Sequence, residues 1–271
     1  MCNIESYLNF LPVDIEEINV SHLGICYLDV RRFKNLKILR CEHNKLTSLY
    51  LNENLQRLCC NSNKLTSLHL NENLQTLYCS NNLLTSLHLN ENLQDLSCNS
   101  NQLTTLHLNE NLQTLYCSNN LLTSLQLNKN LQTLYCSNNL LTSLQLNKKL
   151  QELACNYNQL TTLHLNEKLE ELYCRNNQLT SIRFNEKLKL KIISHNNNPI
   201  CEIIGVKAPI KQLNIFNKFK YLYYSLKYKK RFRDLLWVKI REPKIKIKYS
   251  HDYLVKHLHE DTDLDELLHN W

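Results

Sequence analysis

Apolar residues in most of this chain recur with a period of nineteen residues. The repeated unit reads L-x-x-L-x-C-x-x-N-x-L-T-[ST]-L-x-L-N-x-[NK], and the letters NLQTLYCSNNLLTSL occur unchanged at 73–87, 111–125 and 130–144. A strict period of this length predicts a stack of coils, one for each repeat. Every unit places one cysteine at the same position: Cys41, Cys60, Cys79, Cys98, Cys117, Cys136, Cys155 and Cys174.

Alternation inside the unit predicts which side chains face the interior. In the L-x-C part, Leu77 and Cys79 point inward and Tyr78 points outward, because successive side chains of a strand lie on opposite sides. The LTSLHL part alternates in the same way, with its leucines inward and His88 outward.

A single nineteen-residue coil is too small to be stable alone. Burial of its few apolar groups does not offset the entropy that is lost in ordering the coil. Stacked coils share apolar surface and form continuous hydrogen-bonded ladders, so the pattern predicts a solenoid. A coil of this length holds a strand, two turns and a return segment, but no full helix. We therefore expect a β-rich solenoid with short parallel strands on one face, extended or strand-like returns on the other, and little helix.

One asparagine follows each predicted strand. An inward amide at this position satisfies backbone groups of the turn, whose burial would otherwise be costly. We predict a structural role for this column: Asn44, Asn63, Asn82, Asn101, Asn120, Asn139, Asn158 and Asn177.

The two ends of the repeat array deviate from the period. The spacing rises to twenty-one residues at both ends, and His195 takes the cysteine position of the last coil. Terminal coils differ because they shield the open ends of the core. We predict an N-terminal cap over 1–22, the solenoid over 23–206, and a basic helical module with an acidic tail over 207–271.

The net charge of +7 is unevenly distributed along the chain. Residues 1–206 hold 17 basic and 17 acidic side chains, 207–249 hold 14 and 2, and 250–271 hold 1 and 6. Apolar residues at helical spacing over 210–238 predict an amphipathic helix in the basic segment.

A basic cluster in this segment is a candidate contact with nucleic acid or an anionic surface. Its residues are Lys227, Lys229, Lys230, Arg231 and Arg233. The structural alternative is that the acidic residues over 260–266 neutralise the cluster within one small packed subdomain.

The sequence lacks the residues that several classes of function require. Gly24 and Gly205 are the only glycines, and neither lies in a nucleotide-binding pattern. The N-terminus does not resemble a secretory signal, and no apolar run is long enough to span a membrane. Twelve cysteines without an export signal favour free thiols in a reducing, intracellular compartment, which we expect to be a host cytoplasm. We expect no enzymatic activity, cofactor or metal.

The cysteine column favours packing over chemistry. A line of one thiol per coil does not gather the four ligands of a zinc site, and buried cysteine behaves as a small hydrophobe. Cys59 differs because it takes an outward strand position, which predicts an exposed thiol. On the return side, a column of histidines is predicted to be a solvated polar face: His69, His88, His107 and His164.

Outward strand positions form the surface on which a function is expected. Tyrosine recurs in one outward column, and acids gather toward the C-terminal end of its neighbour. Tyrosine is favoured at protein interfaces because it contributes a large contact area at low entropic cost, and the acids favour a basic partner. The alternative is that the tyrosines only cover the sheet. The predicted partner-binding face comprises Arg57, Tyr78, Asp95, Tyr116, Tyr135, Glu152, Glu171 and Tyr173.

The L-x-x-L-x-C-x-x-N core resembles the leucine-rich-repeat signature, with cysteine in place of the third leucine. The unit is similar to the cysteine-ladder repeats of bacterial internalins, and the Gly-poor style and the tail LLWVKIREPKIKIKYSHDYL resemble leucine-rich-repeat proteins of mimivirus-like giant viruses. This resemblance implies a leucine-rich-repeat solenoid but supplies no activity to carry over. The expected binding of an unidentified protein therefore rests on the strand face.

A second resemblance concerns the N-terminus. FLPVDIEEI is similar to the opening of an F-box, which would imply a ubiquitin-ligase substrate adaptor. The solenoid register begins too soon after it for a complete domain of that kind, so we favour a cap.

Overall fold

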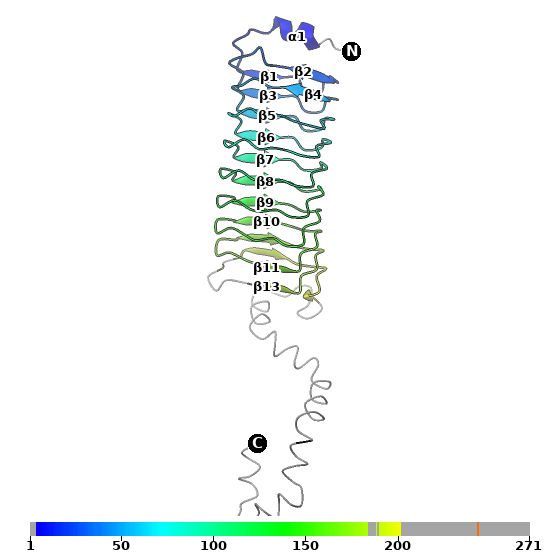
Figure 1. Cartoon of the computed structure of the whole chain (residues 1–271), viewed down its shortest axis with the longest axis vertical. Coiled ribbons are helices and arrows are strands. Elements are labelled where there is room, and N and C mark those ends of the chain that lie inside the picture. The colour runs from blue at the N-terminus through cyan, green and yellow to red at the C-terminus, as the bar shows by residue number, and fades with distance from the viewer. Residues whose placement is uncertain (1–3, 184–187, 189, 202–242, 244–271) are drawn as a thin grey trace, which may run out of the picture. The chain divides into compact units, whose positions relative to one another are not determined.

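The computed structural model describes residues 4–183, 188, 190–201 and 243 (Figure 1). The chain divides into two units, Met1–Asn217 and Lys218–Trp271, and the described residues lie almost entirely in the first. The predicted basic helix, the cluster over 227–233 and the acidic tail lie outside the described residues.

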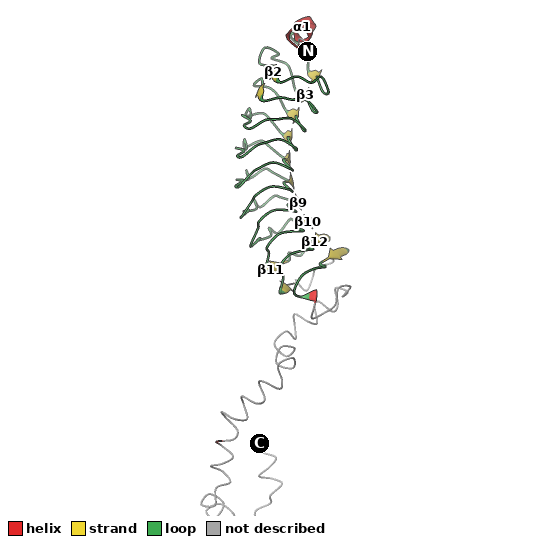
Figure 2. Ribbon diagram, turned by 90° about the vertical axis from the view of Figure 1, so that its right-hand side faces the viewer, coloured by secondary structure: helices red, strands yellow, loops and turns green. Residues whose placement is uncertain are grey.

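The described part of the first unit is a solenoid of parallel strands with a short helix at its N-terminal end (Figures 1 and 2). The helix α1 spans Ile4–Phe10. Ten strands form one parallel sheet in the order β1-β3-β5-β6-β7-β8-β9-β10-β12-β14. They span Glu17–Asn19, Ile38–Arg40, Arg57–Cys59, Thr76–Tyr78, Asp95–Ser97, Thr114–Tyr116, Thr133–Tyr135, Glu152–Ala154, Glu171–Tyr173 and Ile192–Ser194.

Each repeat is one coil, as the period predicts. Equivalent residues of neighbouring coils are register partners, so Leu77 pairs with Leu96 and Leu96 with Leu115. The twenty-one-residue spacing appears at both ends, where β1 pairs with β3 and β12 with β14. Strand β1 is the first strand of the sheet although it lies within the predicted cap, so this stretch contributes a coil as well as α1.

The return side is less regular than the strand side. Two pairs of strands occur there: β2 (Tyr27–Asp29) with β4 (Ser48–Tyr50), and β11 (Thr162–His164) with β13 (Ser181–Arg183). The described coils between these pairs return without an assigned strand. The strand-like returns that the alternation allows therefore form only near the ends of the stack.

Stacked leucines and cysteines fill the interior. The ladder cysteines and the strand leucines beside them, such as Leu77 and Leu115, have no exposed surface. Each coil therefore buries its apolar side chains against identical side chains of its neighbours, which is the packing that a coil needs for stability.

The asparagine that follows each strand closes the turn, as predicted. In one coil, Asn120 Nδ2 donates to the carbonyl oxygens of Cys98, Cys117 and Ser118, at 3.0, 3.1 and 3.4 Å. Its Oδ1 accepts a hydrogen bond from Leu103 N at 3.0 Å. One buried amide thus satisfies backbone groups of two consecutive coils.

A left-handed residue precedes this asparagine in each described coil from Asn44 to Asn198. These positions have φ between 52 and 57°, and asparagine, serine or histidine occupies nearly all of them. Asparagine in particular tolerates this conformation, which is costly for most side chains. Tyr157 is the exception, and its ring is exposed to solvent.

Replacing Asn120 with leucine is expected to destabilise the solenoid by about 3 kcal/mol, because several buried backbone groups lose their partner at once. The difference in free energy of unfolding is measured by urea denaturation. Gln113→Ala, an exposed position in the same coil, is the matched control and is expected to change stability little. Equal stability of the two variants would contradict the structural role of the asparagine column.

Candidate partner-binding face

Register partners in the sheet place the predicted face in two straight columns. Cys59, Tyr78, Ser97, Tyr116, Tyr135, Ala154 and Tyr173 succeed one another in the first column. Arg57, Thr76, Asp95, Thr114, Thr133, Glu152 and Glu171 succeed one another in the second. All eight predicted face residues are half-buried and lie on this one surface.

Tyrosines at the C-terminal end of the face are held by their neighbours. The rings of Tyr116 and Tyr135 meet edge to face, with centroids 4.9 Å apart. The hydroxyl of Tyr135 donates to Glu152 Oε2 at 3.3 Å, and that of Tyr173 donates to Glu171 Oε2 at 3.1 Å. The rings are therefore oriented before any partner arrives.

These contacts also govern the ionisation of the phenols. Desolvation, followed by the charge of Glu152, raises the pKa of Tyr135 to about 12. For Tyr173 the hydrogen bond to Glu171 is the largest cause of a raised pKa. Both hydroxyls remain protonated donors at neutral pH.

Basic side chains dominate the N-terminal end of the same face. The guanidinium of Arg57 lies over the ring of Tyr78, 5.3 Å from the centroid. Arg40 Nε pairs with Glu17 Oε1 at 3.0 Å. The face is thus polarised, with arginines toward β3 and β5 and acids toward β10 and β12.

Cys59 is not the exposed thiol that its outward position predicts. Its exposed fraction is 2%. It lies between Arg40 and Tyr78 in the column, and Arg57 contacts it from the neighbouring column. The sequence rule predicted the direction of the side chain correctly but not the long side chains that cover it.

Ladder cysteines occupy the interior rather than this face. Burial raises the pKa of every ladder thiol, and coulombic interaction with neighbouring thiols adds to the shift at positions such as Cys117. Among the described residues, no group of three or more His, Cys, Asp or Glu side chains is placed to hold a metal ion. The ladder therefore serves packing in this structure.

His195 holds the cysteine position of the last coil and is buried there. Its Nδ1 lies 3.2 Å from Cys201 Sγ, and that thiol donates to the carbonyl oxygen of His195 at 3.1 Å. A polar pair thus replaces the apolar thiol contact at this end of the ladder. The return-side histidines His69, His88, His107 and His164 are all exposed, in agreement with the predicted polar face.

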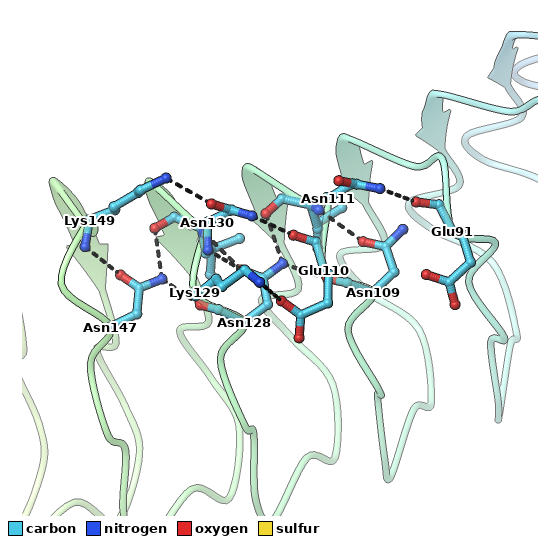
Figure 3. Close-up of polar contacts among 11 residues, drawn as sticks. Glu91, Asn109, Glu110, Asn111, Asn128, Lys129, Asn130, Asn147 and Lys149 are labelled. Atoms are coloured by element: carbon cyan, nitrogen blue, oxygen red, sulfur yellow. Dashed lines mark hydrogen bonds and ion pairs between the residues drawn. The ribbon is translucent and has the colours of Figure 1, made fainter.

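A second asparagine column was not recognised as structural from the sequence. Asn128 Nδ2 donates to the carbonyl oxygens of Asn109 and Leu112, at 2.5 and 2.9 Å, and its Oδ1 accepts from Leu131 N at 2.7 Å (Figure 3). On the same edge, Asn111 and Asn130 donate to the carbonyl oxygens of Glu91 and Glu110. The asparagine that recurs in the L-x-L-N part of the repeat was the sequence feature that could have indicated this column.

The same edge carries exposed charges that have no part in the face. Glu53, Glu72, Glu91 and Glu110 recur at one position, and Lys129 follows them with an ion pair of 3.5 Å to Glu110 (Figure 3). Such exposed pairs contribute little to stability. Glu72 and Glu91 are useful as acidic control positions away from the strand face.

Burial predicts that the ladder thiols are unreactive in the folded chain. After brief treatment with iodoacetamide and peptide mapping by mass spectrometry, we expect modification of exposed Cys26 and none of Cys117. Both react after unfolding in urea. Native modification of Cys117 at the rate of Cys26 would contradict a packed ladder.

The raised thiol pKa values also predict that alkali destabilises the solenoid. Unfolded thiols ionise above their ordinary pKa of 9.0, whereas folded ones stay protonated, so stability is full below that pH and falls as the pH rises. Each ladder thiol contributes a slope of about 1.4 kcal/mol per pH unit. Urea denaturation under reducing conditions across this range measures it, and Cys117→Ala should show a shallower slope than the wild type. Identical slopes would refute the assignment.

Comparison with known proteins identifies the fold through structure alone. No protein-family model matches the chain, and no curated protein sequence matches it. The described residues contain no helix that is long and apolar enough to cross a membrane.

Solved structures do match. YopM from Yersinia enterocolitica is 27% identical over 68% of this chain and 49% of that one, with a TM-score of 0.53. The functional domain of InlJ from Listeria monocytogenes, which includes a cysteine ladder, is 26% identical over 74% and 57%, with a TM-score of 0.51. The APL1 leucine-rich-repeat domain is 21% identical over 69% and 63%, with a TM-score of 0.58. The chain thus covers less than two thirds of each of these structures, and it has the leucine-rich-repeat fold with an internal cysteine ladder.

Proposed function

We propose that this protein is a non-enzymatic scaffold that binds a protein partner through the strand face of its solenoid. The observation that carries the proposal is the row of tyrosines that are already oriented by neighbouring side chains, through the Tyr116–Tyr135 ring contact and the hydroxyl bonds to Glu152 and Glu171. Side chains that are ordered before binding lose little entropy on association.

The distribution of residue types over the solenoid also supports the strand face as the binding surface. The interior thiols and asparagines are buried and serve packing and turns, and the return-side histidines are exposed to solvent. The strand face combines aromatic rings with charged groups, which is the composition of interface centres. Solved leucine-rich-repeat structures of similar form are consistent with a binding scaffold.

Two alternatives rest on sequence alone. Binding of nucleic acid or an anionic surface would use the cluster over 227–233, and a ubiquitin-ligase adaptor would use the LPVDI stretch. The kinship with giant-virus proteins and a location in the host cytoplasm are likewise proposals from resemblance and composition. Nucleic-acid binding would weaken steeply with salt and would be lost on neutralising 227–233.

Replacing Tyr78, Tyr116, Tyr135 and Tyr173 together with alanine is expected to remove the bound partner, because truncation of aromatic anchors typically costs more than 1 kcal/mol each. Proteins captured from cell extract by the variant and by the wild type are compared by quantitative mass spectrometry. The matched control replaces the return-side residues His69, His88, His107 and His164 with alanine and should capture what the wild type captures. The same protein set on all three baits would overturn the proposal.

A further inference from the structure

The C-terminal end of the strand face carries carboxylates that form no ion pair with a described cation. Glu152 and Glu171 are adjacent register partners, yet neither takes part in the ion pairs found among the described residues. Each accepts a hydrogen bond from a tyrosine hydroxyl, which orients the carboxylate but leaves its charge in place.

Two described cations of the neighbouring strand segments have direct partners other than Glu152 and Glu171. Arg175 Nε donates to Ser194 Oγ, and Lys191 Nζ pairs with Glu170 Oε2 at 2.5 Å. Two like charges on adjacent strands repel each other, so the pair is destabilising unless a cation is supplied. Among the described residues, Lys191 acts on Glu171 through its charge, but no cation forms an ion pair with Glu152 or Glu171.

The N-terminal end of the same face shows what such a cation does. Arg57 lies one coil before Tyr78 and places its guanidinium over that ring. The position that Arg57 holds relative to Tyr78 is held by Glu152 relative to Tyr173. Tyr78 therefore has an arginine over its ring, whereas Tyr173 has the carboxylate of Glu152 at the equivalent position.

We propose that the surface formed by Tyr135, Glu152, Glu171 and Tyr173 binds an arginine side chain from an extended basic segment of a separate partner protein. The guanidinium lies against a tyrosine ring, as Arg57 does on Tyr78, and donates hydrogen bonds to the two carboxylates. Arginine fits better than lysine because its planar group stacks on rings and bonds carboxylates in pairs. This inference rests on the proposed function and specifies the class of partner.

Asp95 extends the surface. Its distance from Glu152 sets the separation that two arginines of the partner segment must span. Asp95 holds the corresponding place one coil before Tyr116 and also has no ion pair among the residues described. It lies three coils from Glu152, which is about 14 Å at the spacing of neighbouring strands. Four residues of an extended chain span about 13 Å. A segment with arginines four residues apart can therefore reach both sites from one side.

The test uses the full chain and a fluorescein-labelled peptide of sequence TRVTVRT, with both arginines replaced by uncharged citrulline in the control peptide. Fluorescence anisotropy measures the dissociation constants. We expect binding of the arginine peptide only, and a loss of about tenfold in affinity in the Glu152→Gln/Glu171→Gln variant. Glu72→Gln/Glu91→Gln removes two exposed acids from another edge and should bind as the wild type does.

Each other outcome would overturn the inference. These outcomes are no binding of the arginine peptide, equal binding of the citrulline peptide, or unchanged affinity in the Glu152→Gln/Glu171→Gln variant. Binding that appears only after the basic residues of 227–233 are changed to glutamine would also overturn it, because this chain's own basic segment rather than a separate partner would then occupy the surface. If the acid variant still captures the partner that the four-tyrosine variant loses, the proposed function stands and the arginine site falls.

Discussion

The fold depends on one constraint, which is that no coil of nineteen residues can bury its apolar side chains without a neighbour. Stability then requires that the inward positions match from coil to coil, because each leucine and cysteine packs on its counterpart above and below. The same stacking closes the backbone ladders and lets one amide, such as Asn120, serve two coils. The interior is therefore constrained at almost every position, and the outward positions are free to vary.

That division explains which residues carry information about function. Residues that recur in every unit, including the cysteine, are those that the packing of coil on coil requires. Letters that change between units are outward, and on the strand face they change from arginine at Arg57 to acid at Glu152 and Glu171. A sequence feature that is regular is, in this architecture, evidence for packing rather than for chemistry.

Much of the solenoid could be predicted because its rules are local and periodic. Alternation placed Leu77 and Cys79 inside and Tyr78 outside, and the period gave the register, both in agreement with the structure. Contacts between side chains that are distant in the sequence were harder to predict. The burial of Cys59 depends on two long side chains from adjacent coils, Arg40 and Tyr78, and on Arg57 of its own strand. The bonds of Tyr135 to Glu152 and of Asn128 to the preceding turn depend on side-chain directions that spacing does not give.

The central claim is that the outward strand columns, and not the cysteine ladder or the return side, form the functional surface. Site-specific photo-crosslinking tests it most directly, with p-benzoylphenylalanine introduced in place of Tyr135 or, as the counterpart on the return side, of His88. We predict that illumination in cell extract joins a discrete partner to the chain labelled at Tyr135 and none to the chain labelled at His88. The opposite result, or the same crosslinked product from both positions, would contradict the account.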